Sequence, residues 1–273
     1  MEASPMLWAA SDLHLREPGN RRLVSEALPT SNDDWLLLAG DIGTADDLRW
    51  LLATVRSLFA GIIFVPGNHD LWVSTEESDS GEAYDRLLDV CHDFDVLTPR
   101  DPWFVLETME GPRYLVPLMM LYDYTGMGSG SMSPEEALAQ ANEAGVVFSD
   151  EYFLRPPQGF ASIAEWSRVQ VADARQGLNA LPATARTILI NHYPLTARPL
   201  GFFRCPYYAL WSGTSATFSW PERYRASHVI YGHQHIPHRF VENGVTYQEV
   251  SLGYPREHRQ RYPVLRAVCK LAR

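Results

Sequence analysis

The sequence has very little lysine and an excess of acidic residues. Lys270 is the only lysine, so arginine supplies nearly all of the 23 basic residues, which 33 acidic residues outnumber to give a net charge of −10. This balance argues against a protein that binds nucleic acid through a broad basic surface, because that mode of binding needs clustered lysine and arginine. It still permits a small local patch of arginine, whose guanidinium group suits bidentate contacts with phosphate.

Cysteine and long apolar runs are also scarce. Cys91, Cys205 and Cys269 are scattered without a CxxC pair, and an odd number of cysteines cannot complete a disulfide framework. We therefore expect a reducing, cytoplasmic setting. The apolar run Met6–Ala10 is too short for the core of a signal peptide, and no run approaches the roughly 18 residues of a membrane span. The sequence predicts a soluble protein with no membrane partner.

The remaining composition favours one large α/β domain over residues 1–273. With 46% hydrophobic residues, a chain of 273 residues can bury a large core. Short apolar runs at Met6–Ala10, Trp35–Ala39 and Ile62–Val65 predict strands. Between the last two lies an amphipathic helix, in which apolar residues recur at three- and four-residue steps from Leu48 to Phe59. This order predicts a layered fold whose strands end at a shared crevice.

Five apolar runs of the sequence end in polar residues that can bind a metal ion. These sets are Asp12 with His14, Asp41, Asn68 with His69 and Asp70, His192, and His233 with His235. Each set has an ordinary structural explanation, because Asp often caps a helix and a lone His is often a surface or core residue. Their joint occurrence after successive strands indicates a functional site.

The residue types in these sets are typical of a metal centre with two ions. Carboxylate and imidazole ligands without thiolates suit Mn, Fe, Zn or Ni. Side chains at i and i+2 of an extended segment point the same way, so Asp12 with His14, and His233 with His235, can each reach one pocket. Seven protein ligands are too many for one tetrahedral site and fit two ions that share a carboxylate.

These motifs resemble those of the calcineurin-like metallophosphoesterases. The matching blocks are Asp12-x-His14, Gly40-Asp41, Gly67-Asn68-His69-Asp70, Asn191-His192 and Gly232-His233-x-His235, in the order of the family. The resemblance implies an α/β fold of the αββα sandwich type. It implies that Asp12, His14 and His235 hold the first metal, that Asn68, His192 and His233 hold the second, and that Asp41 bridges both. It also implies that His69 contacts the leaving-group oxygen and that Asp70 orients the His69 ring.

Two stretches, 122–157 and 195–218, lack simple periodicity and match no motif of the family. We expect them to be insertions that cover the site like a cap. Arg198, Arg204 and Arg256 are candidate substrate contacts, because a guanidinium group can bind a second phosphate or a carboxylate. Trp211, with the aromatic residues around it, is a candidate wall for a flat group. The simpler explanations are a solvated charge for each arginine and loop packing for the aromatic residues.

Together these features predict a hydrolase of phosphate esters that uses two metal ions, with Mn or Fe favoured and Zn or Ni as alternatives. The mechanism expected is attack by a hydroxide held between the ions, because phosphoryl transfer needs positioning and charge neutralisation more than a protein nucleophile. The favoured substrate is a small phosphomonoester. The alternatives are a cyclic-nucleotide or other phosphodiesterase and a non-catalytic interaction scaffold, although scaffolds of this kind tend to lose the ligands that this chain retains. The sequence does not determine the oligomeric state.

Overall fold

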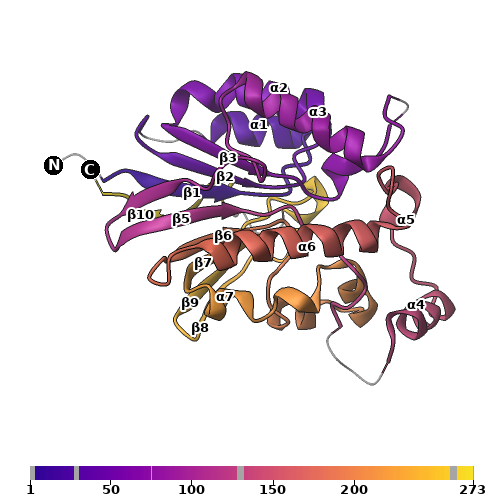
Figure 1. Ribbon diagram of the computed structural model, residues 1–273. Helices are drawn as coiled ribbons and strands as arrows, with labels where there is room; N and C mark the ends of the chain where they lie inside the picture. Colours follow the sequence, from indigo (N-terminus) through magenta and orange to yellow (C-terminus); the bar gives the residue numbers. More distant parts are fainter. Residues whose placement is uncertain (1–3, 28–30, 75, 128–131, 259–262, 273) are drawn as a thin grey trace.

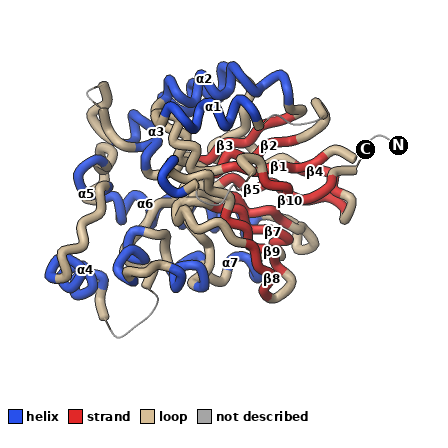
Figure 2. Tube along the Cα trace, turned by 180° about the vertical axis from the view of Figure 1, so that it is seen from behind, coloured by secondary structure: helices blue, strands red, loops and turns tan. Residues whose placement is uncertain are grey.

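A computed structural model describes residues 4–27, 31–74, 76–127, 132–258 and 263–272. Two β-sheets pack face to face, and helices cover the outer face of each sheet (Figure 1). The predicted αββα sandwich is therefore confirmed. Figures 1 and 2 both place α4 (Pro134–Glu143) and α5 (Asp150–Phe153) at the end of the molecule that lies away from the two termini.

The first sheet has the strand order β10-β1-β2-β3. Its strands are β1 (Met6–Ala10), β2 (Trp35–Ala39), β3 (Gly61–Val65) and β10 (Arg266–Lys270). Strands β1, β2 and β3 are parallel, and β10 is antiparallel to β1. Parallel neighbours need a crossover connection, and α1 (Pro18–Glu26) and α2 (Ala45–Val55) supply two of them. The predicted strands and the amphipathic helix are thus found where the apolar pattern placed them.

The second sheet has the strand order β4-β5-β6-β7-β9-β8. Its strands are β4 (Val105–Thr108), β5 (Gly111–Pro117), β6 (Thr187–Ile190), β7 (Ala226–Tyr231), β8 (Arg239–Glu242) and β9 (Val245–Glu249). The four central strands run parallel to one another, and β4 and β8 join the edges as the antiparallel arms of hairpins. The carboxyl ends of the parallel strands therefore lie along one edge of this sheet.

The other helices cover the sheets or connect the loops. They are α3 (Ser80–Asp93), α6 (Ile163–Ala180), α7 (Trp220–Arg223) and the short 3₁₀ helices η1 (Arg56–Leu58), η2 (His69–Leu71), η3 (Arg198–Phe202), η4 (Pro206–Trp211), η5 (Ser215–Thr217) and η6 (Pro255–Glu257). The outer face of the first sheet packs against α2 and α3, and the outer face of the second packs against α6 and α7. The central strands of both sheets are thereby shielded from water on both faces, whereas the edge strands β4 and β8 keep exposed side chains.

A shared apolar layer holds the two sheets together. Leu37 and Ile63 of the first sheet are buried with Leu115, Ile188 and Ile230 of the second. Alternate residues of a strand point to opposite faces, so neighbours of these residues, such as Leu36 and Leu38, pack instead under the helices. This layer fixes the relative position of the two sheets, and hence of the loops that leave their carboxyl ends.

The insertion 122–157 is more regular than its sequence indicated. Helix α4 begins at a capping box, in which the Ser133 hydroxyl accepts from the backbone of Glu136 and the Glu136 carboxylate accepts from the backbone of Ser133. Its buried face consists only of Ala137 and Ala141. Two small residues give a weak apolar period, which explains why the pattern was not recognised as a helix.

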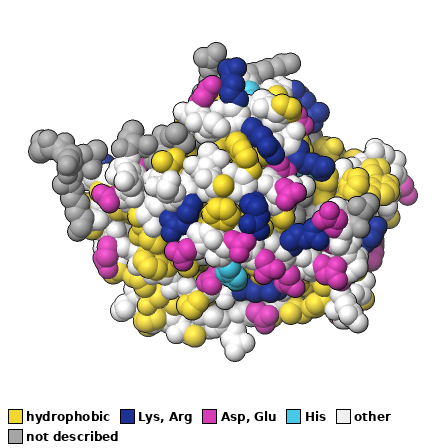
Figure 3. All heavy atoms as spheres, turned by 90° about the horizontal axis from the view of Figure 1, so that it is seen from above, with side chains coloured by type: hydrophobic (Ala, Val, Ile, Leu, Met, Phe, Trp, Pro, Cys, Tyr) yellow, Lys and Arg dark blue, Asp and Glu magenta, His cyan; other side chains and the backbone are white. Residues whose placement is uncertain are grey.

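The surface over α1, α2 and α3 carries charges of both signs (Figure 3). Arginine and acidic side chains alternate there and form ion pairs such as Arg49 with Asp93 and Arg100 with Asp85. Mixed charges of this kind do not give the single-sign field that a nucleic-acid backbone requires. Among the described residues, no helix is both long and apolar enough to cross a membrane.

Replacing Leu37 by Ala should destabilise the sandwich. Leu37 is fully buried between the sheets, and such truncations cost about 2 to 5 kcal/mol because they lose apolar contacts and leave a cavity. Urea denaturation followed by tryptophan fluorescence measures the free energy of unfolding. The control Val241→Ala, at a side chain that is 64% exposed on β8, should change it by less than about 0.5 kcal/mol. Equal effects of the two changes would contradict the assignment of the core.

Candidate metal centre

The polar sets recognised in the sequence meet where the two sheets end. Asp12 and His14 follow β1, Asp41 follows β2, and Asn68 with His69 follows β3, all from the first sheet. His192 follows β6, and His233 with His235 follows β7, both from the second sheet. Because both sheets end at the same place, side chains more than 200 positions apart in the sequence come into contact.

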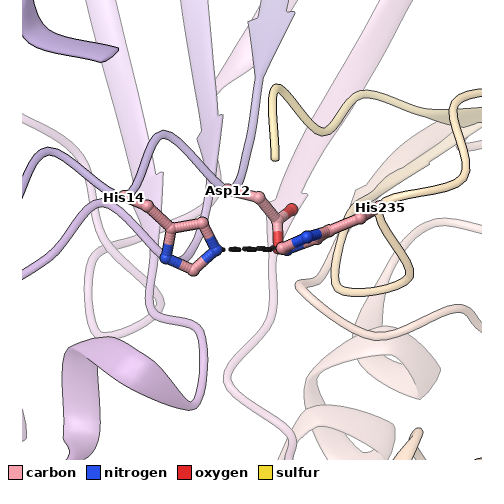
Figure 4. Close-up of side chains that lie close together, drawn as sticks. All are labelled: Asp12, His14 and His235. Atoms are coloured by element: carbon pink, nitrogen blue, oxygen red, sulfur yellow. Dashed lines mark hydrogen bonds and ion pairs between the residues drawn. The ribbon is translucent and has the colours of Figure 1, made fainter. Parts of the chain in front are cut away.

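One group of ligand atoms forms around Asp12. The Nε2 atom of His235 lies 3.0 Å from Asp12 Oδ1 and 3.1 Å from His14 Nε2. Figure 4 shows the two imidazole rings on either side of the Asp12 carboxylate, with their nitrogen atoms directed toward one another. These three residues are the set that the family resemblance assigned to the first metal.

A second group of ligand atoms forms around the Asn68 amide. Its Oδ1 atom lies 3.1 Å from His192 Nε2 and 3.2 Å from His233 Nδ1. Asp41 lies between the two groups, because its Oδ2 atom is 3.5 Å from His192 Nε2 and 4.0 Å from His14 Nε2. The structure thus brings all seven predicted ligands together, with Asp41 in the position expected of a bridge.

The backbone of this site is held in an unfavourable conformation. Five of the seven predicted ligands have a positive φ angle between 40° and 70°, namely Asp12, His14, Asp41, His233 and His235. Residues other than glycine rarely adopt this region, and each such residue costs of the order of 1 kcal/mol or more. Backbone strain concentrated at the predicted ligands indicates that function constrains the placement of their side chains.

The donor set fits metal ions, because unprotonated ligand atoms face one another. The Nδ1 atom of His192 lies 2.8 Å from the Ala39 carbonyl oxygen, which can only accept, so this nitrogen donates and Nε2 is left with a lone pair. That lone pair is directed toward two oxygen acceptors, those of Asn68 and Asp41. When His192 is neutral these three electron-rich atoms repel one another, so either a proton on Nε2 or a metal cation between them is needed.

Carboxylates in this site also create a demand for positive charge. Burial lowers the pKa of His235, but Asp12 and Glu257 outweigh burial and raise it to about 10. Burial likewise lowers the pKa of His192, but the carboxylates of Asp41 and Asp12 raise it to about 10. Asp12 and Asp41 are almost completely buried, and a buried charge needs a nearby opposite charge. Without metal the protons on His192 and His235 provide it, and bound metal ions would take the place of those protons.

Asp70 does not have the role that the resemblance implied. Its Oδ2 atom accepts from the backbone amides of Asp41 at 2.7 Å and Gly67 at 2.8 Å, and its Oδ1 atom accepts from Ile42 and Gly43. A carboxylate that accepts four backbone amides ties the loop after β2 to the loop after β3. The prediction that Asp70 orients the His69 ring is therefore wrong for this structure, because both oxygens are used elsewhere.

The His69 ring is instead positioned by aromatic contacts. It lies on the Trp72 indole with 3.8 Å between ring centroids and meets His14 edge-on at 4.9 Å. Its Nε2 atom lies 3.9 Å from Asp41 Oδ2, beside the ligand groups, and its side chain is 24% exposed. His69 can therefore reach a molecule bound at the metal centre.

Gly67 allows the loops after β2 and β3 to approach each other closely. A Cβ atom at this position would lie 2.1 Å from Asp41 Oδ1 and 2.6 Å from the Asp41 backbone nitrogen. Such distances are far inside van der Waals contact, so any other residue would displace Asp41. The glycine of this motif is thus required by the packing of the metal centre.

A cavity of about 450 Å³ opens onto the metal ligands. Asp41, Asn68, His69, His233 and His235 contribute to its lining, with Trp72, Tyr254 and Glu257 beside them. The insertions 122–157 and 195–218 also contribute, the first through Val147, Phe148, Ser149 and Asp150 and the second through Phe203 and Tyr208. Both insertions therefore lie next to the predicted metal ions.

The candidate substrate residues are mostly placed elsewhere. Trp211 is buried behind the cavity wall, where it stacks on Phe148 with ring centroids 5.3 Å apart. Arg198 lies over the Phe240 ring on β8, Arg204 is exposed outside the cavity lining, and Arg256 is 80% exposed next to Tyr254 and Glu257 at its margin. The predicted contact of Trp211 is wrong because the residue packs into the underside of the loop.

Two residues that support the ligands, Glu257 and Asp150, were not among the predicted site residues. Glu257 accepts from His235 Nδ1 at 2.7 Å and so directs His235 Nε2 toward Asp12. Asp150 accepts from the Asn68 amide at 2.9 Å. Neither residue is part of a motif, and only contacts between distant segments reveal them. Glu257 could have been suspected of a role at the site, because it follows β9, the last strand of the second sheet along the chain.

Comparisons with known proteins agree with this geometry. A sequence model of the calcineurin-like phosphoesterases matches residues 6–237. The chain is 41% identical over 265 residues to acyl-carrier-protein phosphodiesterase PptH of Mycobacterium tuberculosis (strain ATCC 25618 / H37Rv), an alignment that covers 96% of this chain and 82% of the relative. The crystal structure of phosphopantetheinyl hydrolase (PptH) from Mycobacterium tuberculosis aligns with a TM-score of 0.91 and 39% identity, over 98% of this chain and 97% of that chain. The chain belongs to the calcineurin-like phosphoesterase family and is a metal-dependent hydrolase of phosphoric esters.

Proposed function

We propose that this chain hydrolyses the phosphodiester that attaches a phosphopantetheinyl group to an acyl carrier protein. The observation that carries the proposal is the likeness to PptH, which is an acyl-carrier-protein phosphodiesterase and a phosphopantetheinyl hydrolase. The sequence alone favoured a small phosphomonoester. We replace that preference with a phosphodiester attached to a protein, because the likeness to PptH supports it.

The insertions support this choice of substrate. In this family the metal centre is common to monoesterases and diesterases, so specificity depends on the surrounding loops. The structural alignment leaves only 2% of this chain uncovered, so it includes most of both 122–157 and 195–218. A likeness that extends through the loops beside the cavity supports a shared substrate more strongly than the ligands alone.

The cavity suits a phosphate that carries a long organic arm. Phe148, Phe203 and Tyr208 give the cavity an apolar side, where Phe148 lies against His233, and His69 lines the same cavity together with Trp72 and Tyr254. The aromatic side can cover the pantetheine chain, and the side with His69 can receive the oxygen of the carrier protein. An apolar wall with a few polar groups is the usual composition of a site for a small organic group.

In the proposed reaction, water hydrolyses the phosphodiester directly, without a covalent enzyme intermediate. Two bound ions, Mn or Fe, would supply positive charge at the phosphoryl oxygens and activate a water molecule. The seven ligands would hold them. Water oxygen becomes bonded to phosphorus, the bond from phosphorus to the carrier-protein oxygen breaks, and His69 donates a proton to that oxygen. The aromatic wall keeps the phosphopantetheine arm in place and water away from it.

The direct test uses an acyl carrier protein loaded with phosphopantetheine. Mass spectrometry of the carrier after incubation with the manganese-loaded protein should show loss of the phosphopantetheinyl group, and free phosphopantetheine should appear. Nitrophenyl phosphate and bis-nitrophenyl phosphate serve as reference substrates under the same conditions. Rapid turnover of the nitrophenyl monoester with an unchanged carrier would instead restore the interpretation as a phosphomonoesterase.

Replacing Asp41 by Asn should remove most of the activity. The change keeps the shape of the side chain and removes the charge that the two ions are proposed to share, so kcat should fall by about 100-fold or more. Metal content measured by plasma mass spectrometry should fall in parallel. The control is Asp46→Asn, an exposed aspartate on α2. Near-native turnover of Asp41→Asn with added Mn would contradict the proposal of two ions.

Replacing His69 by Asn should reduce activity in a way that depends on the leaving group. A proton donor matters most for an alkoxide of high pKa, so the loss on the carrier protein should be about 100-fold or more and much smaller on a nitrophenyl ester. Steady-state kinetics on both substrates measure this difference. His92→Asn, at a half-exposed histidine on α3, is the control. Equal losses on both substrates together with loss of metal would make His69 a metal ligand.

A further inference from the structure

We infer that Asp150, supplied by the 122–157 insertion, is a positioning residue that holds both the metal ligand Asn68 and the aromatic support of His69. The inference rests on the proposed hydrolysis and deepens it, because it assigns the insertion a role inside the reaction centre. Asp150 begins α5 and is 1% exposed. It belongs to no motif in the sequence.

One oxygen atom of Asp150 makes both contacts. Its Oδ1 atom accepts from Asn68 Nδ2 at 2.9 Å and from the Trp72 indole Nε1 at 2.7 Å. Both distances are those of good hydrogen bonds, and Asp150 itself is 1% exposed, which strengthens bonds made to it. Removing this acceptor would leave two N–H groups without a partner.

The contact with Asn68 decides which atom of its amide faces the metal centre. An amide has an oxygen and a nitrogen that are nearly equal in size, and only the oxygen can bind a cation. Because Nδ2 donates to Asp150, Oδ1 is directed toward His192 and His233. Asp150 thus does for Asn68 what a carboxylate partner does for a ligating histidine.

Through its contact with Trp72, Asp150 also influences His69, the residue proposed to protonate the leaving group. The Trp72 ring lies against His69 with centroids 3.8 Å apart, and it also stacks on Phe153 at 4.7 Å. Phe153 and Asp150 belong to the same short helix, α5. The helix therefore fixes the indole both at its N–H group and by stacking, and the indole in turn limits the orientations of the His69 ring.

These contacts do not depend on the charge of Asp150. Burial raises the pKa of its carboxyl group to about 7. The carbonyl oxygen of a protonated carboxyl group accepts hydrogen bonds as a carboxylate oxygen does. The positioning role therefore follows from geometry and holds in either protonation state.

The experiment compares four variants of the full-length protein. Asp150→Ala removes both contacts, Asp150→Asn keeps an acceptor oxygen of the same shape, and Trp72→Phe removes only the indole N–H group. The matched control is Glu151→Ala, the next residue of α5, which accepts from Tyr124 and from Trp211 within the insertions. This control loosens the insertions without touching Asn68 or Trp72.

The first measurement is binding of Mn²⁺ alone to metal-free protein by calorimetry. Asp150→Ala should weaken the affinity of the second metal by about 10- to 100-fold, the usual effect of removing a partner of a metal ligand. Asp150→Asn should restore it to within about threefold, since its amide oxygen can accept in the same place. Trp72→Phe and Glu151→Ala should leave it unchanged.

The second measurement is the ratio of kcat on the carrier protein to kcat on bis-nitrophenyl phosphate at saturating Mn²⁺. This ratio should fall in Asp150→Ala and in Trp72→Phe, because a misplaced His69 affects the poorer leaving group more. It should remain unchanged in Glu151→Ala and be largely restored in Asp150→Asn.

Two outcomes would overturn the inference. If Asp150→Ala bound Mn²⁺ as tightly as the unmutated protein, the Asn68 amide would not need Asp150 as a hydrogen-bond partner. An equal loss of affinity in Glu151→Ala would show that loosening of the insertions, rather than the bonds to Asp150, is responsible. Failure of the proposed function is separate, since it would appear as an unchanged carrier protein in the unmutated chain, whereas the calorimetry needs no substrate. In that case a nitrophenyl ester pair of different leaving-group pKa replaces the carrier in the second measurement.

Discussion

The burial of two carboxylates, those of Asp12 and Asp41, is the constraint on which the rest of the site depends. A charge removed from water is costly unless opposite charge lies close by. His192 and His235 lie against these carboxylates, and their Nδ1 atoms donate to Ala39 and Glu257, so Nε2 is the ring atom that faces inward and can carry either a proton or a metal ion. The site is thus organised for cations before any substrate arrives.

The positions of the ligands could be predicted from the sequence because each one directly follows a short apolar run. Strand ends are local features. Asp12 and His14 do meet at one pocket, although their backbone has positive φ angles and not the extended geometry on which the i and i+2 argument relied. Three strands of the first sheet were predictable for the same reason, since β1, β2 and β3 are continuous apolar segments. What the pattern could not supply was the contact across the sandwich, such as that of Asp12 with His235.

Residues that act through others escaped sequence analysis for a physical reason. Asp150 and Glu257 carry no periodic signal, and their partners Asn68 and His235 are brought to them only by folding. Asp70 was recognised as part of the site but given the wrong partner, because its sequence position next to His69 says nothing about the amides that converge on it. The sequence could not show whether Trp211 lines the cavity or packs under the loop, because an aromatic-rich stretch is expected in either case.

The pairing of β10 with β1 has a consequence for the order in which the protein can mature. The strand that carries Asp12 and His14 at its end is bordered by a strand that spans residues 266–270, and its ligand His235 comes from the second sheet. A chain that is still being synthesised must therefore extend beyond Lys270 before the sheet around the first ligands is complete. The group of Asp12, His14 and His235 is consequently complete only with residue 235 in place, and the sheet that carries its first two members only with residues 266–270.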